Sequence, residues 1–247
     1  MKSKVVAVIP ARLHSSRFPG KVLHPHRGKP LLYYVWNQVR KARRIDRLII
    51  ATDSGEIASE ARKFGAEVML TARRHRSGTD RVGEVALETS GQLYINIQAD
   101  NFGLKGEVLD RVIMQMLADR KIKFATLGRK STSRDDLGNR SLVKVALGRD
   151  NSALWFSRLP IPCNANESRT APEHNNPHYV HIGVYFFRRR ALLDFCRWGA
   201  SPLEKIESLE QLRILENHQQ IRLFPTRIET VSVDTPEDMR KIKSLYG

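Results

Sequence analysis

The segment from residue 10 to residue 21 combines three cationic side chains with small and turn-forming residues. It reads Pro-Ala-Arg-Leu-His-Ser-Ser-Arg-Phe-Pro-Gly-Lys and directly follows a short apolar run. A triphosphate needs backbone amides that approach it closely and flexible cations that neutralise its charge. The segment offers both, although it lacks the Gly-x-x-x-x-Gly-Lys-Ser/Thr spacing of a P-loop. A phosphate-binding loop and a basic surface loop are therefore both open interpretations of this segment.

Two aspartates follow, in the sequence, apolar runs that are typical of buried strands. Asp100 comes after the run 93–97, and Asp234 directly follows the run 231–233. Carboxylates at the ends of strands can share a hard cation such as Mg²⁺, which would bridge them to triphosphate oxygens. Asp234 also precedes Thr235 and Pro236, so it could instead cap a helix, and one residue can serve both purposes.

Other polar residues have chemistry that suits an acidic ligand, and each also has a structural interpretation. Arg158 can bind a carboxylate through two parallel hydrogen bonds, or it can form a surface ion pair. His181 lies in an apolar strand, where a structural histidine is the common case. Glu204, Glu207 and Glu210 recur every three residues on one helical face, which by itself indicates a solvated surface.

The first hundred residues alternate between short apolar runs and segments with helical spacing. Strands are predicted at 5–9, 48–51, 68–70 and 93–97, and helices at 30–39, 56–64 and 79–89. This alternation predicts parallel strands joined by right-handed crossovers. Ligands of such sheets bind beyond the carboxyl ends of the strands. We therefore expect the loops after Ile9, Leu70 and Ile97 to converge on one site.

The second half of the chain has a mixed pattern. We predict helices at 106–118 and 203–216, strands at 124–127 and 180–187, a β pair at 143–147 and 153–156, an irregular stretch at 160–177, and a final helix that begins near 235. No repeat and no linker is evident. The whole pattern predicts a single α/β domain over residues 1–247.

Composition supports one globular domain and excludes several classes of protein. Of the 247 residues, 41% are hydrophobic and 28% are charged, which is enough for a sizeable core. No window approaches the ~20 apolar residues that span a bilayer. The N-terminus lacks the features of a signal peptide, and the two cysteines, Cys163 and Cys196, are far apart. These features predict a cytoplasmic protein with reduced thiols.

The formal net charge of +16 is the one unusual bulk feature. It is compatible with nucleic-acid binding or with a basic surface that attracts anionic substrates. No zinc-finger spacing and no RNP-like aromatic motif accompanies the charge. We therefore favour the anionic substrate over nucleic acid.

Motifs spread along nearly the whole chain resemble those of the 3-deoxy-manno-octulosonate cytidylyltransferases, also called CMP-KDO synthetases. Residues 10–21 match the opening signature of that family, and 201–213 match its Ser-Pro-Leu-Glu motif. Further matches are at 51–53, 75–81, 156–158, 181–185 and 233–238. The resemblance implies a three-layer, mostly parallel, Rossmann-like nucleotidyltransferase sheet. It also implies transfer of a cytidylyl group from CTP to the anomeric hydroxyl of KDO, with Mg²⁺ bound and pyrophosphate released.

The resemblance further implies a role for each matching residue. The catalytic residues would be Arg12, Lys21, Asp100 and Asp234, with the two aspartates holding Mg²⁺. The nucleotide-binding residues would be Pro10, Ala11, Arg12, Lys21, Ser77, Gly78, Arg81 and Gln98. The sugar-binding residues would be Arg158, His181, Tyr185, Glu210 and Gln211.

The resemblance also carries expectations about assembly and setting. Residues 128–187 would form a β-rich sub-domain that contributes sugar-binding and dimer contacts. The protein would be a cytoplasmic homodimer that supplies lipopolysaccharide synthesis.

One segment departs from the family pattern. The family motif Gln-Gly-Asp-Glu-Pro is replaced here by Gln98-Ala99-Asp100-Asn101-Phe102, which keeps the aspartate alone of the last four residues. The change could alter metal affinity or sugar preference. The alternatives are therefore a cytidylyltransferase for a related sugar acid such as 8-amino-3,8-dideoxy-manno-octulosonate, use of another base, or a degenerate relative that binds nucleotide or nucleic acid.

Overall fold

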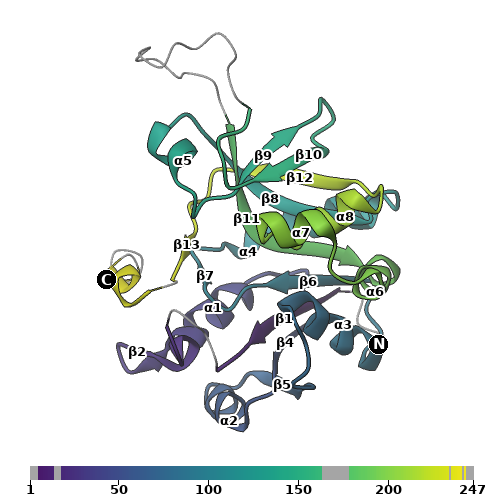
Figure 1. The fold of residues 1–247 in the computed structure, drawn as a ribbon. Coiled ribbons are helices and arrows are strands. Elements are labelled where there is room, and N and C mark those ends of the chain that lie inside the picture. The colour runs from purple at the N-terminus through teal and green to yellow at the C-terminus, as the bar shows by residue number, and fades with distance from the viewer. Residues whose placement is uncertain (1–4, 14–17, 163–177, 234, 241, 243–247) are drawn as a thin grey trace.

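A nine-stranded sheet forms the centre of the molecule (Figure 1). The structure is a computed structural model, and it describes residues 5–13, 18–162, 178–233, 235–240 and 242. The strand order is β10-β9-β11-β6-β1-β4-β5, and β8 and β12 continue the sheet beside β11. The α/β class predicted from the sequence is confirmed.

The first half of the chain builds the parallel part of the sheet. Its strands are β1 (Val5–Ala11), β4 (Arg47–Thr52), β5 (Glu67–Leu70) and β6 (Leu93–Ile97). Strand β1 pairs in parallel with β4 and β6, and β4 pairs in parallel with β5. The helices between them are α1 (Leu31–Val39), α2 (Gly55–Lys63) and α3 (Gly78–Glu88). This arrangement confirms the predicted alternation and places the loops after β1, β5 and β6 at one edge.

The second half of the chain extends the same sheet with antiparallel strands. These are β8 (Phe124–Ser131), β9 (Lys144–Leu147), β10 (Ala153–Ser157) and β11 (His178–Arg188), with β12 (Ile221–Thr226) parallel to β8. The long strand β11 pairs with β6, β8 and β9. The predicted β pair is β9 and β10. The described parts of the β-rich region, 128–162 and 178–187, thus extend the central sheet.

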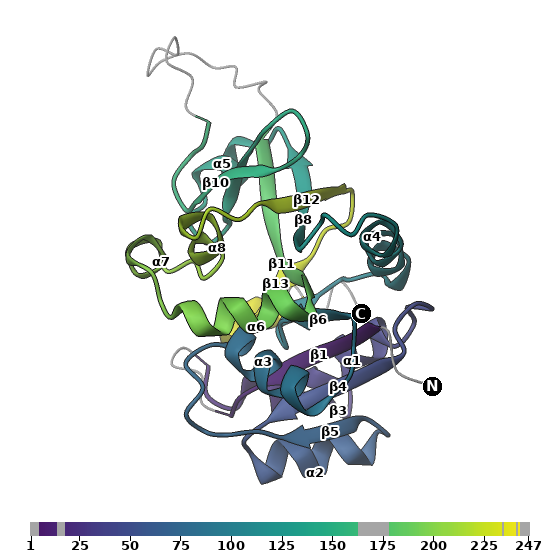
Figure 2. The ribbon, with the colours of Figure 1, turned by 90° about the vertical axis from the view of Figure 1, so that its right-hand side faces the viewer.

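Helices cover both faces of the sheet, and β1 shows why. Its alternate residues enter two separate cores, with Val5, Ala7 and Ile9 on one side and Val6 and Val8 on the other. The first core is closed by α1, α2 and α4 (Gly106–Ala118). The second is closed by α3, α6 (Arg189–Trp198) and α8 (Leu212–Glu216). Figure 2 shows α3 and α6 on the opposite side of the sheet from α4.

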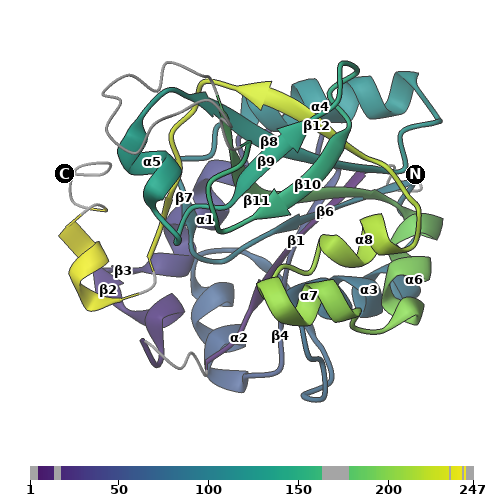
Figure 3. The same cartoon turned by 45° about the horizontal axis from the view of Figure 1, so that its top comes forward.

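The predicted continuous helix at 203–216 is wrong. The structure has α7 (Pro202–Glu207) and α8, with a break at Ser208, whose φ of 55° and ψ of 46° are left-handed. A capping box between Ser201 and Glu204 begins α7, and Figure 3 shows the two short helices beside α3 and α6. Because of the break, residues 209–211 lie in the connection between the two helices.

Short elements complete the edge where the loops meet. They are the turn η1 (Lys21–Leu23), the hairpin β2 (Pro25–His26) and β3 (Lys29–Pro30), the ribbon β7 (Asn101–Phe102) with β13 (Val231–Ser232), α5 (Arg134–Gly138) and η2 (Pro236–Asp238). Helix α6 and strand β12 are not among the elements predicted from the sequence. The predicted irregular stretch is described only for 160–162, and residues 163–177 lie outside the described residues.

Two further findings concern the described part of the chain. Cys196 is a free thiol, whereas Cys163 lies outside the described residues. Within the described ranges, no helix has both the length and the hydropathy that crossing a membrane requires.

Candidate active site

The cationic loop after β1 meets the ends of β6 and β13. The ammonium group of Lys21 forms an ion pair with the carboxylate of Asp100 and donates to the carbonyl oxygen of Val233 at 2.8 Å. Both side chains keep some contact with water, at 13% and 24% exposure. Gly20 has a φ of 67°, and its N–H donates to the carbonyl oxygen of Leu13 at 2.9 Å, which closes the loop. Two of the three predicted loops therefore converge.

The third loop, after β5, joins them through Arg12. The Arg12 guanidinium donates to the carbonyl oxygens of His75 at 2.7 Å and Arg76 at 3.3 Å. The start of α3 also packs on β1, since a Cβ added to Gly78 would lie 3.1 Å from Cγ of Pro10. The expected convergence of the three loops is confirmed.

Two predicted nucleotide-binding residues have clear structural tasks. Ser77 caps α3: its hydroxyl accepts from the N–H of Asp80 at 3.1 Å, and its own N–H donates back to the Asp80 carboxylate at 3.1 Å. Arg81 is fully buried, and its guanidinium binds Thr71 and, at 3.1 Å, Asp53. Burial lowers the pKa of Arg81. Arg81 therefore braces the nearby strand ends, and its predicted contact with the nucleotide stays a prediction.

A cavity of about 1260 Å³ lies next to this cluster. Its walls include all five predicted sugar-binding residues, which are Arg158, His181, Tyr185, Glu210 and Gln211. Gln98 and Asn101 also line the cavity, and they stand on either side of Asp100 in the chain. The cavity therefore adjoins the ion pair of Lys21 and Asp100.

The histidine of the cavity is neutral and its tautomer follows from its neighbours. Nε2 of His181 lies 2.8 Å from the hydroxyl of Thr126, which donates its one proton to the carbonyl oxygen of Val184 at 2.8 Å. Nε2 therefore carries a proton, and Nδ1 is an acceptor. Desolvation lowers the pKa of His181 to about 3. The strand is irregular here, because its pairing with β8 shifts register between Ile182 and Tyr185, and such bulges re-aim side chains.

Two buried amides in the cavity wall have hydrogen-bonding capacity to spare. The Tyr185 hydroxyl donates to Oε1 of Gln211 at 2.9 Å, and burial raises the Tyr185 pKa. Nε2 of Gln211 and Oδ1 of Asn101 have no partner among the described residues, although the two residues are only 2% and 3% exposed. Leaving a buried polar atom unpaired costs about 1–3 kcal/mol. Both amides are therefore suited to a ligand that supplies the missing partner.

Arg158 is held by Lys144, a residue that is not among the predicted site residues. The fully buried Lys144 donates to the carbonyl oxygen of Arg158 at 2.6 Å, and to two more carbonyl oxygens at 139 and 142. The Arg158 guanidinium in turn donates to the carbonyl oxygens of Glu207 at 3.3 Å and Arg140 at 3.2 Å. The sequence feature that could have identified Lys144 is its position inside the predicted apolar strand 143–147.

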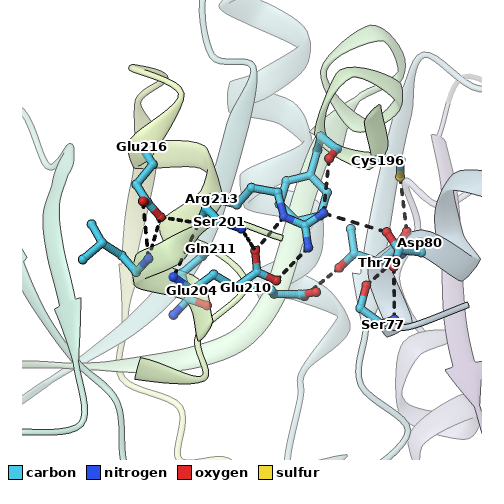
Figure 4. A network of polar contacts seen from close by, with 12 residues as sticks. Ser77, Thr79, Asp80, Cys196, Ser201, Glu204, Glu210, Gln211, Arg213 and Glu216 are labelled. Carbon is cyan, nitrogen blue, oxygen red and sulfur yellow. Dashed lines mark hydrogen bonds and ion pairs between the residues drawn. The ribbon is translucent and has the colours of Figure 1, made fainter. Parts of the chain in front are cut away.

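Glu210 is held by a residue of helix α3. The Thr79 hydroxyl donates to its carboxylate at 2.6 Å, and the buried guanidinium of Arg213 lies nearby between Glu204 and Asp80 (Figure 4). Desolvation raises the pKa of Glu210. The acidic face that the sequence predicted as solvated is thus partly a fixed polar network.

The metal prediction rests on Asp100 alone within the described residues, because Asp234 lies outside them. The described residues contain no cluster of three or more His, Cys, Asp or Glu side chains able to hold a metal ion. One or two carboxylates plus substrate phosphates are nevertheless the usual ligands of Mg²⁺. Asp100 fits a metal that binds together with a triphosphate, and not a metal held by protein ligands alone.

The parallel sheet, the cationic loop and the carboxylate at the strand end define an α/β nucleotidyltransferase. Residues 6–221 match the cytidylyltransferase family model. The 3-deoxy-manno-octulosonate cytidylyltransferase of Geobacter metallireducens is 38% identical over 244 residues, which are 97% of this chain and 96% of the relative. The enzyme of the same name from Syntrophobacter fumaroxidans is 40% identical over 242 residues, covering 97% and 95% of the two chains.

A solved structure agrees with these relatives. CMP:2-keto-3-deoxy-manno-octonic acid synthetase complexed with CTP superposes with a TM-score of 0.90 and 33% identity, covering 99% of this chain and 98% of that one. The chain belongs to the 3-deoxy-manno-octulosonate cytidylyltransferase family, and the resemblance drawn from its motifs is confirmed.

Proposed function

We propose that this enzyme transfers a cytidylyl group from CTP to the anomeric hydroxyl of KDO and releases pyrophosphate. The observation that carries the proposal is the position of the Lys21–Asp100 pair beside the cavity that contains the five sugar-binding candidates. In this proposal the triphosphate would therefore bind next to the sugar acid. Family membership supports the same pair of substrates.

The reaction is one in-line displacement at phosphorus. The hydroxyl oxygen of the sugar acid forms a bond to the α-phosphorus, the bond to the β-phosphate oxygen breaks, and the hydroxyl proton leaves to solvent. Lys21 and Arg12 carry the positive charge that binds the triphosphate and the departing pyrophosphate. Asp100 and Asp234 would hold Mg²⁺ in this proposal, and the ion would add to the charge neutralisation of the phosphate oxygens.

The cavity residues orient the sugar acid. The Arg158 guanidinium suits the carboxylate of the sugar. Nδ1 of His181 and the Glu210 carboxylate accept hydrogen bonds from hydroxyls, and Nε2 of Gln211 donates one. Holding both substrates in one geometry replaces a bimolecular encounter with an oriented one, which is a large part of such catalysis.

A second candidate substrate is the 8-amino analogue of KDO, and the replacement of the family's glutamate by Asn101 motivates it. The side-chain oxygen of Asn101 is buried in the cavity wall and has no partner among the described residues. It can accept a hydrogen bond from an ammonium group as well as from a hydroxyl.

The experiment is a panel of CTP, UTP, ATP and GTP, each with KDO and with its 8-amino analogue, followed by pyrophosphate release. We expect CTP with KDO to give the highest kcat/KM. Preference for the 8-amino sugar would select the second candidate, and no release with any pair would refute both.

The setting of the enzyme is part of the proposal and rests on the resemblance. We place it in the cytoplasm as a homodimer that supplies lipopolysaccharide synthesis, with dimer contacts from the region 128–187. We infer that its net charge of +16 attracts anionic substrates and does not serve to bind nucleic acid.

A further inference from the structure

Two buried residues behind Glu210 form a chain of hydrogen bonds that ends on its carboxylate. Nδ2 of Asn96, on β6, donates to Oγ1 of Thr79 at 2.8 Å. Oγ1 of Thr79, on α3, donates to Oε1 of Glu210 at 2.6 Å, the contact drawn in Figure 4. Asn96 and Thr79 are both 0% exposed. This series of hydrogen bonds therefore runs from the middle of the sheet to the cavity wall.

The chemistry of the three groups gives this chain a direction. The amide nitrogen of Asn96 can only donate, so the Thr79 oxygen receives that bond. The single proton of the Thr79 hydroxyl is then directed at Glu210, which must accept it. A carboxylate that accepts on one oxygen from a fixed donor is restricted in rotation, and its other oxygen keeps a defined position.

We propose that Asn96 and Thr79 are positioning residues for Glu210, which they hold in the orientation that accepts a hydroxyl of the sugar acid. This inference rests on the proposed function, because it takes Glu210 as a contact of the sugar. Neither residue lines the cavity, so both act through Glu210 and not by touching the substrate.

The hydrogen bond from Thr79 affects the pKa of Glu210. Burial raises the pKa of Glu210, and the hydrogen bond from Thr79 opposes that rise. Other charged or titratable groups around Glu210 come from five elements: Asp80 on α3, Glu204 on α7, Arg213 on α8, Tyr185 on β11 and Cys196 on α6. Without the Thr79 hydroxyl the carboxylate should take up its proton at higher pH.

The test uses three variants of the chain and one matched control. Thr79→Val keeps the shape but removes the donor, and Thr79→Ser keeps the donor. Asn96→Asp replaces the donor behind Thr79 with an acceptor, which turns the Thr79 proton away from Glu210. The control is Thr89→Val, because Thr89 is also buried beside α3 but bonds the carbonyl oxygen of Val85 and the hydroxyl of Tyr94.

We expect Thr79→Val and Asn96→Asp to lower kcat/KM for the sugar acid about tenfold, the effect of one hydrogen bond, with KM for CTP unchanged. The acid limb of the pH profile should move to higher pH, and an NMR titration of the free protein should show a raised pKa for Glu210. Thr79→Ser should stay within about twofold of the parent protein. Thr89→Val should lower thermal stability and leave the pH profile in place.

An unchanged pH profile and an unchanged Glu210 titration in Thr79→Val would overturn the inference. If Thr79→Val does not fold, the same two measurements on Asn96→Asp decide. A parent protein that releases no pyrophosphate refutes the proposed function, whereas the NMR titration still tests the contact with Glu210. The two failures are therefore distinguishable.

Discussion

The Lys21 ammonium group lies against the Asp100 carboxylate, although the two residues are 79 positions apart in the chain. In the free protein the two charges neutralise each other. In the proposed reaction, each group would exchange this partner when a magnesium-bound triphosphate binds, Lys21 for a phosphate and Asp100 for the metal. On that proposal, the ion pair keeps both groups beside the place that the triphosphate would take.

Removal of the cation should reduce activity far more than stability. We expect Lys21→Ala to lower kcat about 10²–10³-fold, the loss typical of removing one transition-state contact. The free energy of unfolding should change by about 1 kcal/mol or less, because the ion pair is partly exposed. Pyrophosphate release and urea unfolding measure the two effects. Lys63→Ala, on the exposed face of α2, is the control, and near-parental turnover of Lys21→Ala would contradict the assignment.

Replacing the Asp100 carboxylate with a neutral amide should weaken the binding of Mg²⁺ and leave the sugar site intact. We expect Asp100→Asn to raise the Mg²⁺ concentration for half-maximal activity, because a neutral amide is a poorer ligand for a hard cation than a carboxylate. The measurement is a titration of activity with Mg²⁺ at saturating CTP. Asp194→Asn on α6, at a carboxylate that is likewise partly exposed, serves as the matched control. A titration curve identical to that of the parent protein argues against Asp100 as a ligand.

His181 should make stability depend on pH. Its pKa in the folded protein is about 3, against about 6.5 in an unfolded chain. Below pH ~6.5 the unfolded state therefore binds a proton that the folded state excludes, and stability falls as the pH drops through this window. We expect His181→Gln to lose less free energy of unfolding between about pH 7 and pH 5 than the parent protein, in urea titrations at each pH. An equal loss in both proteins would show that His181 is not responsible.

Arg213 should be important for stability. Its side chain is only 4% exposed, binds Glu204 at 2.7 and 2.8 Å, and lies 4.2 Å from the centre of the Phe195 ring. Removing one member of a buried ion pair leaves the other charge without compensation, so we expect Arg213→Leu to cost about 3–5 kcal/mol of unfolding free energy.

Chemical denaturation checks this value. Arg190→Ala, at a side chain that is 89% exposed, should change stability by about 0.5 kcal/mol or less. A loss no larger than that of the control would mean that the Arg213 network contributes little.

Much of the fold is predictable from local patterns. The apolar run of β1 is buried along its whole length, and the caps at Ser54 and Ser77 begin α2 and α3 as side-chain chemistry demands. The helix break at Ser208 was not predictable in the same way. Residues 203–216 have good helical composition, but Glu210 and Gln211 bond Thr79 and Tyr185, which lie on other elements. Tertiary contacts thus override the local preference.

The sequence by itself determined the family, the parallel half of the sheet and the convergence of three loops. These features follow from the order of the motifs and from the alternation of apolar runs with helical spacing along the chain. Only the tertiary structure decided which side chains reach the cavity. It buried Arg81, placed Lys144 behind Arg158 and aligned Asn96 with Thr79 and Glu210. Hydrogen bonds between distant residues depend on how sheets and helices pack, and no local pattern in the chain encodes that packing.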